Sequence, residues 1–327
     1  MNEQALLFAL GSSHGWGAQV AARLGLALSA HEERQFEDGE HKARPLSDVR
    51  QRDVYLLSSL YGDNERSVND KLVALLFFIS ALKDAGAGCV TAVMPLLAYA
   101  RKDRQTQSRD PVTTRYVARL LEAAGVDRVV TIDVHNLAAY QNAFRCETVH
   151  LEATGLFCDH FANTMGARSA AVVSPDAGGM KRAERFRLRL AQALGRPVTA
   201  AFAEKHRANN ELTGDAFVGD VKDRVAIIID DLIASGSTLA RTARSCLDAG
   251  AREVHAVATH GLFVGSANSI LGDHALTSIV VCDSVPTFRV SAANLRDKIV
   301  VLSCAELVAQ AIALLHNGGS IEHLLGH

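Results

Sequence analysis

VAIIIDDLIASGST, residues 225–238, combines a strand pattern with a polar loop. Five apolar residues come first, which is typical of a strand that is covered on both faces in a parallel sheet. We predict that this strand ends on two adjacent acids, Asp230 and Asp231, and that the loop leads into the helical pattern LARTARSCLDAG. Parallel sheets bind their ligands at the carboxyl ends of the strands. We therefore expect a ligand site at this strand end.

Similar apolar runs recur between helical patterns along the chain. They are DVYLLSS (53–59), CVTAVMP (89–95), RVVTIDVH (128–135), AAVVSPD (170–176), EVHAVATH (253–260) and SIVVCD (278–283). Near-continuous apolar strands that alternate with helices indicate parallel sheets with helices on both faces. The predicted fold class is therefore α/β.

Chain length and an internal similarity predict two domains. At 327 residues the chain is longer than one hydrophobic core usually serves. DAGAGCVTAV (84–93) and DAGAREVHAV (248–257) share seven of ten residues, 164 positions apart. A generic unit of helix, glycine cap and strand would explain this likeness, but the spacing favours a duplication that gives two similar domains. We place them at residues 1–150 and 151–327, with a last helix that can pack back on the first domain.

The composition argues against several classes of protein. The chain is 48% hydrophobic and 21% charged, has a net charge of −2 and contains no polybasic stripe, so we expect neither nucleic acid nor a membrane as its partner. Its longest apolar run, LVALLFFISAL (72–82), is shorter than the roughly 20 residues of a membrane span and predicts a buried helix. Six cysteines without a C-x-x-C pair, and the lack of a signal peptide pattern, predict a cytoplasmic protein.

The loop after residue 233 has the features of a phosphate site. No P-loop and no G-x-G-x-x-G fingerprint occurs in the chain, so a nucleotide must be held in another way. Residues 235–238 open a helix, and free N–H groups at a helix N-terminus bind phosphate. The two preceding acids can accept hydrogen bonds from a vicinal diol or lie near Mg²⁺, which together with a phosphate indicates a ribose phosphate. The alternative is that Ser237 or Thr238 is a simple N-cap and that the acids are solvated.

The whole chain resembles the ribose-phosphate diphosphokinase (PRPP synthetase) family. Besides the opening stretch, the motifs are QFEDGEH (35–41), SVNDKLVALLFFISALKDAGAGCVTAVMPLLAYARKDR (67–104), RDPVTTRYVARLLEAAGVDRVVTIDVH (109–135), VVSPDAGG (172–179), GDV (219–221) and VATHGLF (257–263). The resemblance implies two domains like those of type I phosphoribosyltransferases. It also implies transfer of the β,γ-diphosphoryl group of Mg-ATP to the anomeric hydroxyl of ribose 5-phosphate, giving PRPP and AMP, in a homo-oligomer that is a dimer or a hexamer.

The resemblance further implies roles for individual residues. The implied ATP-binding residues, on the first domain, are Phe36, Asp38, Glu40, Arg101, Lys102 and His135. The implied ribose 5-phosphate-binding residues, on the second, are Asp176, Asp230, Asp231, Ala234, Ser235, Gly236, Ser237 and Thr238. His135 and Asp176 are the implied Mg²⁺ ligands. Lys205 and Arg207 are the implied catalytic cations, on a flexible loop.

The residues by themselves support these roles unequally. His135 and Asp176 follow predicted strands, where site residues are expected, although a histidine at a strand end is often structural. AEKHRANNE (203–211) is predicted to be a polar loop. Its cations have a catalytic or binding role only if the loop has to cover a polyanionic ligand. FEDGE (36–40) alone is an acidic turn at its glycine, so its role depends wholly on the resemblance.

Several positions depart from the commoner synthetase pattern. Ala234 stands in place of Asp, Ser237 of Gly, Lys102 of Gln and His206 of Arg, and NLAAYQNAF (136–144) differs substantially. Two alternatives therefore stay open, a catalytically silent regulatory paralogue and a nucleobase phosphoribosyltransferase. The retained loop cations argue against the first of these, and the ATP-like first half argues against the second.

Overall fold

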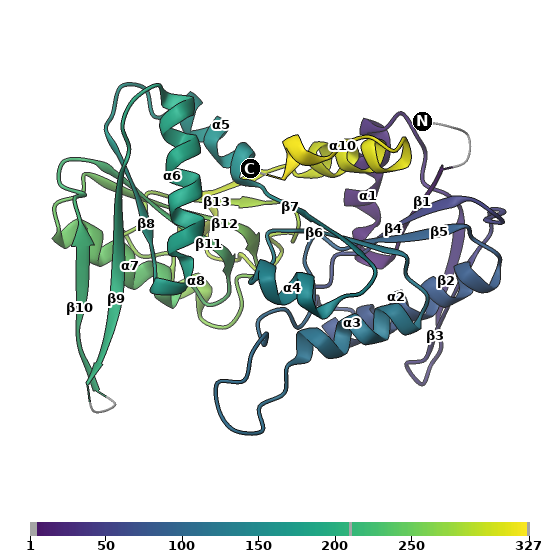
Figure 1. The fold of residues 1–327 in the computed structure, drawn as a ribbon. Coiled ribbons are helices and arrows are strands. Elements are labelled where there is room, and N and C mark those ends of the chain that lie inside the picture. Colours follow the sequence, from purple (N-terminus) through teal and green to yellow (C-terminus); the bar gives the residue numbers. More distant parts are fainter. Residues whose placement is uncertain (1–4, 209–210, 326–327) are drawn as a thin grey trace. The chain divides into compact units, whose positions relative to one another are not determined.

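The computed structural model describes residues 5–208 and 211–325, and gives only the backbone for residues 204–208 and 211–216. The chain forms two compact units (Figure 1). Unit 1 comprises Met1–Glu152 and Cys304–His327, and unit 2 comprises Ala153–Ser303. Each unit contains one main sheet with helices against it, which confirms the predicted α/β class.

Unit 1 is built on a five-stranded parallel sheet. Its strands, in spatial order, are β1 (Ala5–Ala9), β4 (Asp53–Leu57), β5 (Cys89–Val93), β6 (Arg128–Ile132) and β7 (Glu147–Leu151). Its helices are α1 (His14–Arg23), α2 (Val68–Asp84), α3 (Thr113–Ala123), α4 (Leu137–Ala143) and α10 (Ala305–His316). Most residues of these strands are buried, because helices lie on both faces of the sheet.

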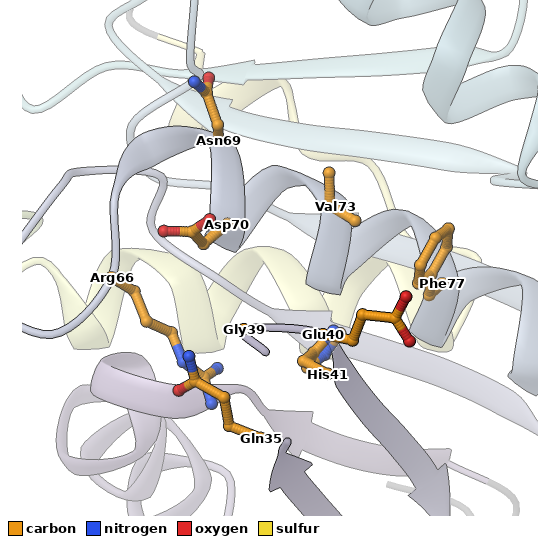
Figure 2. Close-up of a pocket in the computed structure, with 9 residues that line it drawn as sticks. All are labelled: Gln35, Gly39, Glu40, His41, Arg66, Asn69, Asp70, Val73 and Phe77. Atoms are coloured by element: carbon orange, nitrogen blue, oxygen red, sulfur yellow. The ribbon is translucent and has the colours of Figure 1, made fainter. Parts of the chain in front are cut away.

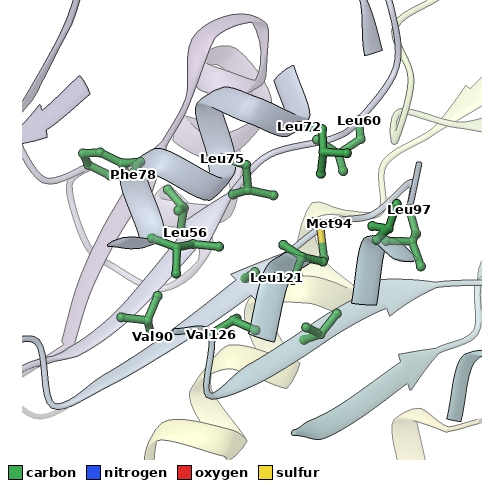
Figure 3. Packing of buried hydrophobic residues seen from close by; sticks show 14 of the residues in the cluster. Leu56, Leu60, Leu72, Leu75, Phe78, Val90, Met94, Leu97, Leu121 and Val126 are labelled. Atoms are coloured by element: carbon green, nitrogen blue, oxygen red, sulfur yellow. The ribbon is translucent and has the colours of Figure 1, made fainter. Parts of the chain in front are cut away.

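The core of unit 1 lies between this sheet and α2. Leu56 and Val90 of the strands belong to one buried cluster with Leu75 and Phe78 of α2 (Figure 3). Each fully buried side chain of this size contributes about 1.5–3 kcal/mol. The helix predicted from the apolar run at 72–82 is therefore confirmed, but it is buried on one face only, since Val73 and Phe77 are exposed.

The end of the chain returns to unit 1. Helix α10 packs on α1. His316 at its last turn lies with Nδ1 2.7 Å from Oδ2 of Asp53, at the start of β4. Residues from Cys304 onward therefore belong to unit 1 rather than to the range 151–327 that we placed in the second domain, and the first boundary lies beside Glu152.

Unit 2 is built on a seven-stranded sheet. In spatial order its strands are β10 (Glu211–Gly219), β9 (Thr199–Ala208), β8 (Ala170–Ser174), β11 (Val225–Ile233), β12 (Glu253–Gly261), β13 (Ser278–Cys282) and β14 (Ile299–Leu302). Only β10 runs antiparallel to its neighbour. The helices of unit 2 are α5 (Thr154–Thr164), α6 (Met180–Leu194), α7 (Ser237–Asp248), α8 (Ala267–Ile270) and α9 (Ala293–Arg296). Helix α6 packs on β8, and α7 packs on β12.

The two sheets share one strand order. In unit 1 the chain passes through β1, a hairpin, β4, β5, β6 and β7, and in unit 2 through β8, a hairpin, β11, β12, β13 and β14. The two similar segments occupy equivalent places, before β5 and before β12. Their glycines, Gly86 and Gly250, have φ values of 88° and 90°, a left-handed conformation that favours glycine after a helix. This equivalence supports the duplication interpretation.

Each unit inserts its hairpin at the same point of the order. In unit 1, β2 (His31–Gln35) and β3 (His41–Pro45) form a separate two-stranded sheet. In unit 2, β9 extends the main sheet and pairs with β10. Our prediction of a polar loop at 203–211 was therefore wrong for the described part of that segment. The strand forms because Thr199–Phe202 pair with β8, and the polar continuation then pairs with β10.

Candidate functional site

The two acids of the opening stretch lie inside β11 and not at its end. The strand continues to Ile233, because its neighbour β12 is equally long and pairs with it up to Gly261. Asp231 is only 5% exposed, and Asp230 is partly buried. Our prediction that the strand ends on these acids was therefore wrong by two to three residues. Both carboxylates still lie near the carboxyl edge of the sheet, beside the loop that follows β11.

A single arginine contacts both acids. Nη1 of Arg182, in the first turn of α6, lies 3.2 Å from Oδ1 of Asp230 and 3.1 Å from Oδ1 of Asp231. Oδ1 of Asp230 also accepts the N–H of Asp231, at 2.9 Å. The side chain of Arg182 is 18% exposed, so one largely buried cation contacts both acids.

Sequence reasoning missed Arg182, although one signal was available. A cation in the first turn of a helix lies at the positive end of the helix dipole, which is unfavourable by about 0.3–1 kcal/mol. Such a residue directly after a strand-end motif, VVSPDAGG, indicates a nearby negative partner. The partners lie 48 and 49 positions further along the chain, so no local pattern connects them.

Burial and repulsion set the ionisation of the acid pair. Burial raises the pKa of Asp230, and the neighbouring charge of Asp231 raises it further, whereas Arg182 lowers it. Asp230 therefore titrates at a pH closer to neutral than a solvated aspartate does.

The loop after β11 leaves the N-terminus of α7 without a side-chain cap. Gly236 is the N-cap residue, with φ of 77°, and no side chain caps the helix. Ser237 is the first helical residue, so the alternative in which Ser237 or Thr238 is a simple N-cap is wrong. The Oγ atoms of Ser235 and Ser237 lie 2.9 Å apart. Uncapped N–H groups with two hydroxyls beside them form a site that is suited to a phosphate.

Asp176 follows β8, the neighbour of β11. Its Oδ1 accepts the N–H of Gly179 at 2.9 Å, and its side chain is exposed. This contact caps the short 3-10 helix Ala177–Gly179, which leads directly into α6. Since β8 and β11 are parallel neighbours, Asp176 lies at the same edge of the sheet as the acid pair. In unit 2 the structure therefore brings Asp176, Asp230, Asp231 and residues 234–238 to one edge.

His135 lies at the corresponding edge of unit 1. It follows β6, after Asp133 with φ of 43° and the buried Val134. The N–H of Val134 contacts Nε2 of His150 at 3.1 Å, which fixes the backbone immediately before His135. The side chain of His135 is exposed.

The FEDGE segment is the turn of the β2–β3 hairpin. The N–H of Phe36 donates to the carbonyl of Glu40 at 2.8 Å, and Gly39 has φ of 92°. Oδ1 of Asp38 accepts the N–H of Glu40 at 3.0 Å. The ring of Phe36 is 38% exposed and carries the guanidinium of Arg34 at 4.9 Å from its centroid. The turn predicted at this glycine is confirmed, and it presents an aromatic ring beside two carboxylates.

A cleft of about 330 Å³ lies between this hairpin and α2 (Figure 2). It is lined by Gln35, Gly39, Glu40, His41, Arg66, Asn69, Asp70, Val73 and Phe77. The rings of His41 and Phe77 are nearly parallel, with centroids 6.5 Å apart. Burial lowers the pKa of His41, and the charge of Arg66 lowers it further. The cleft thus includes Glu40 of the predicted ATP site, whereas Phe36 and Asp38 are not among its lining residues.

Lys205 and Arg207 lie in β9. Their backbones pair with Asp215 and Leu212 of β10. Their side chains lie outside the described part of the structure.

Comparison with known proteins places the chain in a family. Residues 5–125 match the N-terminal domain of ribose phosphate pyrophosphokinase, and residues 198–326 match the phosphoribosyl synthetase-associated domain. Over 314 residues, or 95% of the chain, it is 36% identical to ribose-phosphate pyrophosphokinase 1 of Streptococcus mutans, of which 93% is covered. It is 35% identical over the same length to that of Streptococcus agalactiae, of which 93% is covered.

A solved structure agrees along nearly the whole chain. Phosphoribosylpyrophosphate synthetase from Mycobacterium smegmatis matches 97% of this chain and 100% of its own, with a TM-score of 0.86 and 31% identity. The chain belongs to the ribose-phosphate pyrophosphokinase family. The resemblance inferred from the sequence motifs is therefore confirmed.

The unusual residues of this pyrophosphokinase family member have clear local settings. The carbonyl of Ala234 accepts the N–H of Val264 at 3.0 Å, so this residue shapes the loop through its backbone. Nζ of Lys102 contacts Oδ2 of Asp110, and also Oγ1 of Thr106 at 3.0 Å. The N–H groups of Thr106 and Gln107 donate to the same carboxylate oxygen at 3.0 Å.

The segment 94–112, between β5 and α3, is thus organised around the carboxylate of Asp110. Hydrogen bonds from Lys102 and Thr106 lower its pKa. Arg101 is exposed beside Lys102. The divergent segment 136–144 is mostly helix α4, capped by Asn136 Oδ1, which accepts the N–H of Ala139 at 3.1 Å.

Proposed function

We propose that the protein is a ribose-phosphate diphosphokinase, which transfers the β,γ-diphosphoryl group of Mg-ATP to ribose 5-phosphate and yields PRPP and AMP. The observation that carries the proposal is the unit 2 edge, where two carboxylates held by Arg182 lie beside an uncapped helix N-terminus. This edge belongs to a chain that matches pyrophosphokinases over 95% of its length.

Ribose 5-phosphate has two groups that suit this edge. Asp230 and Asp231 accept hydrogen bonds from the vicinal hydroxyls of the ribose. The 5-phosphate lies against the N–H groups and hydroxyls of residues 235–238, where the helix dipole favours an anion. Ala234 takes part through its backbone, so the missing carboxylate at that position does not remove the phosphate cradle.

The ATP side of the proposal draws on unit 1. Phe36 offers an aromatic surface of the kind on which a purine stacks, and Asp38 and Glu40 offer acceptors for its amino group. Arg101 and Lys102 supply positive charge, which suits phosphates. His135 contacts the ATP phosphates from the edge of the first sheet. These assignments are inferred from the motif positions and from the exposure of the residues.

In the proposed reaction the anomeric oxygen forms a bond with the β-phosphorus of ATP. The bond from that phosphorus to the oxygen bridging it to the α-phosphorus breaks, AMP leaves, and the hydroxyl proton passes to solvent. Such a transfer depends on alignment and on stabilisation of the phosphoryl charge. Lys205 and Arg207 supply that charge, and removal of one such preorganised group typically costs about 100- to 1000-fold in rate.

Mg²⁺ is the proposed cofactor. Asp176 fits it, because Mg²⁺ prefers oxygen ligands and usually binds through one or two carboxylates together with substrate phosphates. One oxygen of Asp176 is engaged with Gly179, so the carboxylate has a fixed orientation. His135 offers a nitrogen, which suits Mg²⁺ less well and suits a metal-bound water or a phosphate better. When bound, the ion neutralises charge on the phosphates of ATP.

We also propose a cytoplasmic homo-oligomer, a dimer or a hexamer. Large apolar side chains on α2 and α3 are exposed, and a second copy would cover them: Val73, Phe77, Tyr116 and Leu120. All six cysteines are free, which suits a reducing compartment. Within residues 5–208 and 211–325, no helix has the length and apolar character needed to span a membrane.

Phosphorus NMR tests the proposal directly. We expect AMP and PRPP to appear in equal amounts when the protein is incubated with Mg²⁺, ATP and ribose 5-phosphate. If several nucleotides and divalent metals give no turnover while ribose 5-phosphate still binds, the protein is instead a silent regulatory paralogue. If PRPP and a nucleobase are converted to a nucleotide, it is a phosphoribosyltransferase.

A further inference from the structure

We propose that Arg182 is the positioning residue of the ribose site, holding Asp230 and Asp231 in the arrangement that receives the ribose hydroxyls. This inference rests on the proposed function of the unit 2 edge. It adds a residue outside the loop and strand motifs to which the site had been assigned, and it gives that residue a role in substrate affinity rather than in chemistry.

The contacts make Arg182 the shared anchor of the two carboxylates. A single nitrogen, Nη1, lies 3.2 Å from Oδ1 of Asp230 and 3.1 Å from Oδ1 of Asp231. In a regular strand, adjacent side chains point to opposite faces, so two neighbouring acids do not converge by default. A common cation holds one oxygen of each. The exposed fractions of the side chains of Asp230 and Asp231 are 25% and 7%, so water has little access to their contacts with Arg182.

The position of Arg182 is itself fixed by the site. Asp176 caps the 3-10 helix that leads into α6, and Arg182 is the third residue of α6. The end of β8 thus determines where the guanidinium lies. A first-turn cation is unfavourable for the helix, and the two acids of β11 offset that cost. One short connection therefore orients both Asp176 and the anchor of the acid pair.

The charge of Arg182 keeps the acids usable as acceptors. Two adjacent carboxylates repel each other, and a protonated carboxyl loses acceptor capacity. The charged groups in contact with Asp230 are Arg182 from α6 and Asp231 from its own strand, and the residue opposite it on β12 is Ala258. The positive charge of Arg182 lowers the pKa of Asp230, as does the N–H of Asp231, and both oppose the rise that burial and the charge of Asp231 cause.

Three variants separate positioning from simple folding. Arg182→Gln removes the charge, Arg182→Lys keeps it with less reach, and Arg187→Gln is the matched control. Arg187 lies on the same helix, is 23% exposed, pairs with Glu184 at 2.6 Å and donates to the carbonyl of Val198 at 3.0 Å. Loss of Arg187 therefore removes a comparable ion pair of α6 away from the acid pair.

We expect Arg182→Gln to raise the Kd and KM for ribose 5-phosphate by roughly 10- to 100-fold, the range for losing hydrogen bonds to a charged group. The KM for ATP should stay within about twofold, because the variant weakens the binding of ribose 5-phosphate and leaves the binding of ATP unchanged. Arg182→Lys should recover at least part of the affinity. In Arg182→Gln the affinity should also begin to fall at a higher pH than in the wild type, because the pKa of Asp230 rises when the cation is removed.

The inference is overturned if Arg182→Gln binds ribose 5-phosphate as the wild type does, or if Arg187→Gln loses as much affinity. It is also overturned if the loss in Arg182→Gln is independent of pH and is not reduced in Arg182→Lys, because a merely structural role would give that result. Calorimetric binding to the wild type separates this failure from a failure of the proposed function. A wild type that does not bind ribose 5-phosphate overturns the site itself.

Discussion

The two units differ in the loop and the helix start that follow equivalent strands. In unit 1, β4 is followed by a loop that folds back on itself before α2, and in unit 2, β11 is followed by a short turn before α7. Helix α2 begins with a capping box, in which the carboxylate of Asp70 accepts the N–H of Ser67 and the hydroxyl of Ser67 accepts the N–H of Asp70. Helix α7 has no side-chain cap. The N-terminus of one helix is thus capped by the chain's own side chains, and that of the other has no side-chain cap.

The charged groups beside these helices differ in the same sense. In unit 1, Nζ of Lys71 lies 2.6 Å from Oδ2 of Asp63 and donates to Oγ of Ser12 at 2.6 Å. Burial alone would raise the pKa of Asp63, but the contact with Lys71 and two backbone N–H groups lower it to about 2. This pair balances its own charge. In unit 2, one cation contacts two acids, and carboxylate oxygens suit hydrogen-bond donors such as ribose hydroxyls.

The contrast shows how a repeated scaffold takes on two roles. The strand order and the glycine turns before β5 and β12 are common to both units. The edges differ in the loops that follow β4 and β11 and in the charged side chains beside them, and these differences decide which edge is closed by internal contacts. Function therefore follows from the edge residues and not from the fold.

Lys205→Ala should give the largest change. We expect kcat to fall by about 100- to 1000-fold, because the variant lacks a charge that stabilises the phosphoryl group in the transition state. Lys42→Ala is the counterpart on the hairpin of unit 1, where Lys42 lies 3.9 Å from Glu32 and is 48% exposed. Steady-state assays of PRPP formation should show little effect of this control. Equal losses in both variants would contradict a special role for the unit 2 hairpin.

Asp231→Asn should be next in size. Loss of a buried charged acceptor should lower kcat/KM for ribose 5-phosphate by roughly 10- to 100-fold. Its counterpart Asp63→Asn should instead cost about 3–5 kcal/mol of stability in unit 1, because it leaves Lys71 buried without its charged partner, with the KM for ribose 5-phosphate unchanged. Kinetics and thermal unfolding of both variants test this separation. The comparison fails if both acids affect the same quantity.

Gly236→Ala should have a smaller but visible effect on the phosphate cradle. Gly236 has φ of 77°, and an added Cβ would lie 2.4 Å from Cγ and Cδ2 of the buried Leu271. The left-handed conformation alone costs about 1–2 kcal/mol, so the loop should shift and weaken ribose 5-phosphate binding about tenfold. Ser67→Ala, at the start of α2, should cost about 1 kcal/mol of stability and leave that binding intact. Calorimetry on both variants measures these effects. Weaker ribose 5-phosphate binding in Ser67→Ala, with unchanged binding in Gly236→Ala, would contradict the comparison.

The pH dependence of stability should have opposite signs in the two units. The folded-state pKa of Glu33 is about 2, because contacts with His31, Gly11 and Arg66 outweigh burial, and that of Asp63 is also lowered to about 2. Both groups stabilise unit 1 above their unfolded-state values, and this contribution is lost as the pH falls toward 2. The raised pKa of Asp230 has the reverse effect on unit 2. Its buried negative charge destabilises the folded state at high pH, and protonation removes this destabilisation as the pH falls.

Hydrogen exchange, corrected for the intrinsic rate, measures this difference. Between pH 7 and pH 3 we expect protection of β1 and β4 to decrease, and Glu33→Gln to reduce that decrease. Asp230→Asn should increase protection of β11 at pH 7 relative to the wild type. A uniform pH response of both sheets would contradict the contrast.

Much of this architecture followed from local sequence pattern. The apolar strand runs, the helix at 72–82 and the family motifs predicted the fold class and the edge on which the acid pair lies. The hairpin β2–β3 was missed, because HEERQ and HKARP contain no β-branched residue and are held by cross-strand ion pairs such as that of Arg44 with Glu32, at 2.5 Å. Side-chain pairing of this kind appears only when the strands are aligned.

The site was predicted less completely than the fold. The sequence singled out one continuous stretch, 230–238, because acids, hydroxyls and glycine are adjacent in it, and the binding roles of these residues stay a prediction. The anchor of the acid pair was missed, because Arg182 lies far away in the chain and its role arises from burial and tertiary contact. The end of β11 was misplaced for the same reason, since the length of β12 determines how far it pairs.

The most direct test is the number of ribose 5-phosphate molecules bound per chain. Isothermal calorimetry on the wild type, Asp231→Asn and Asp63→Asn measures that number and the affinity. The account predicts one molecule per chain in the wild type and in Asp63→Asn, and a strongly weakened site in Asp231→Asn. Two molecules per chain, or loss of binding in Asp63→Asn with Asp231→Asn unaffected, would contradict the claim that only the edge of unit 2 is open to this ligand.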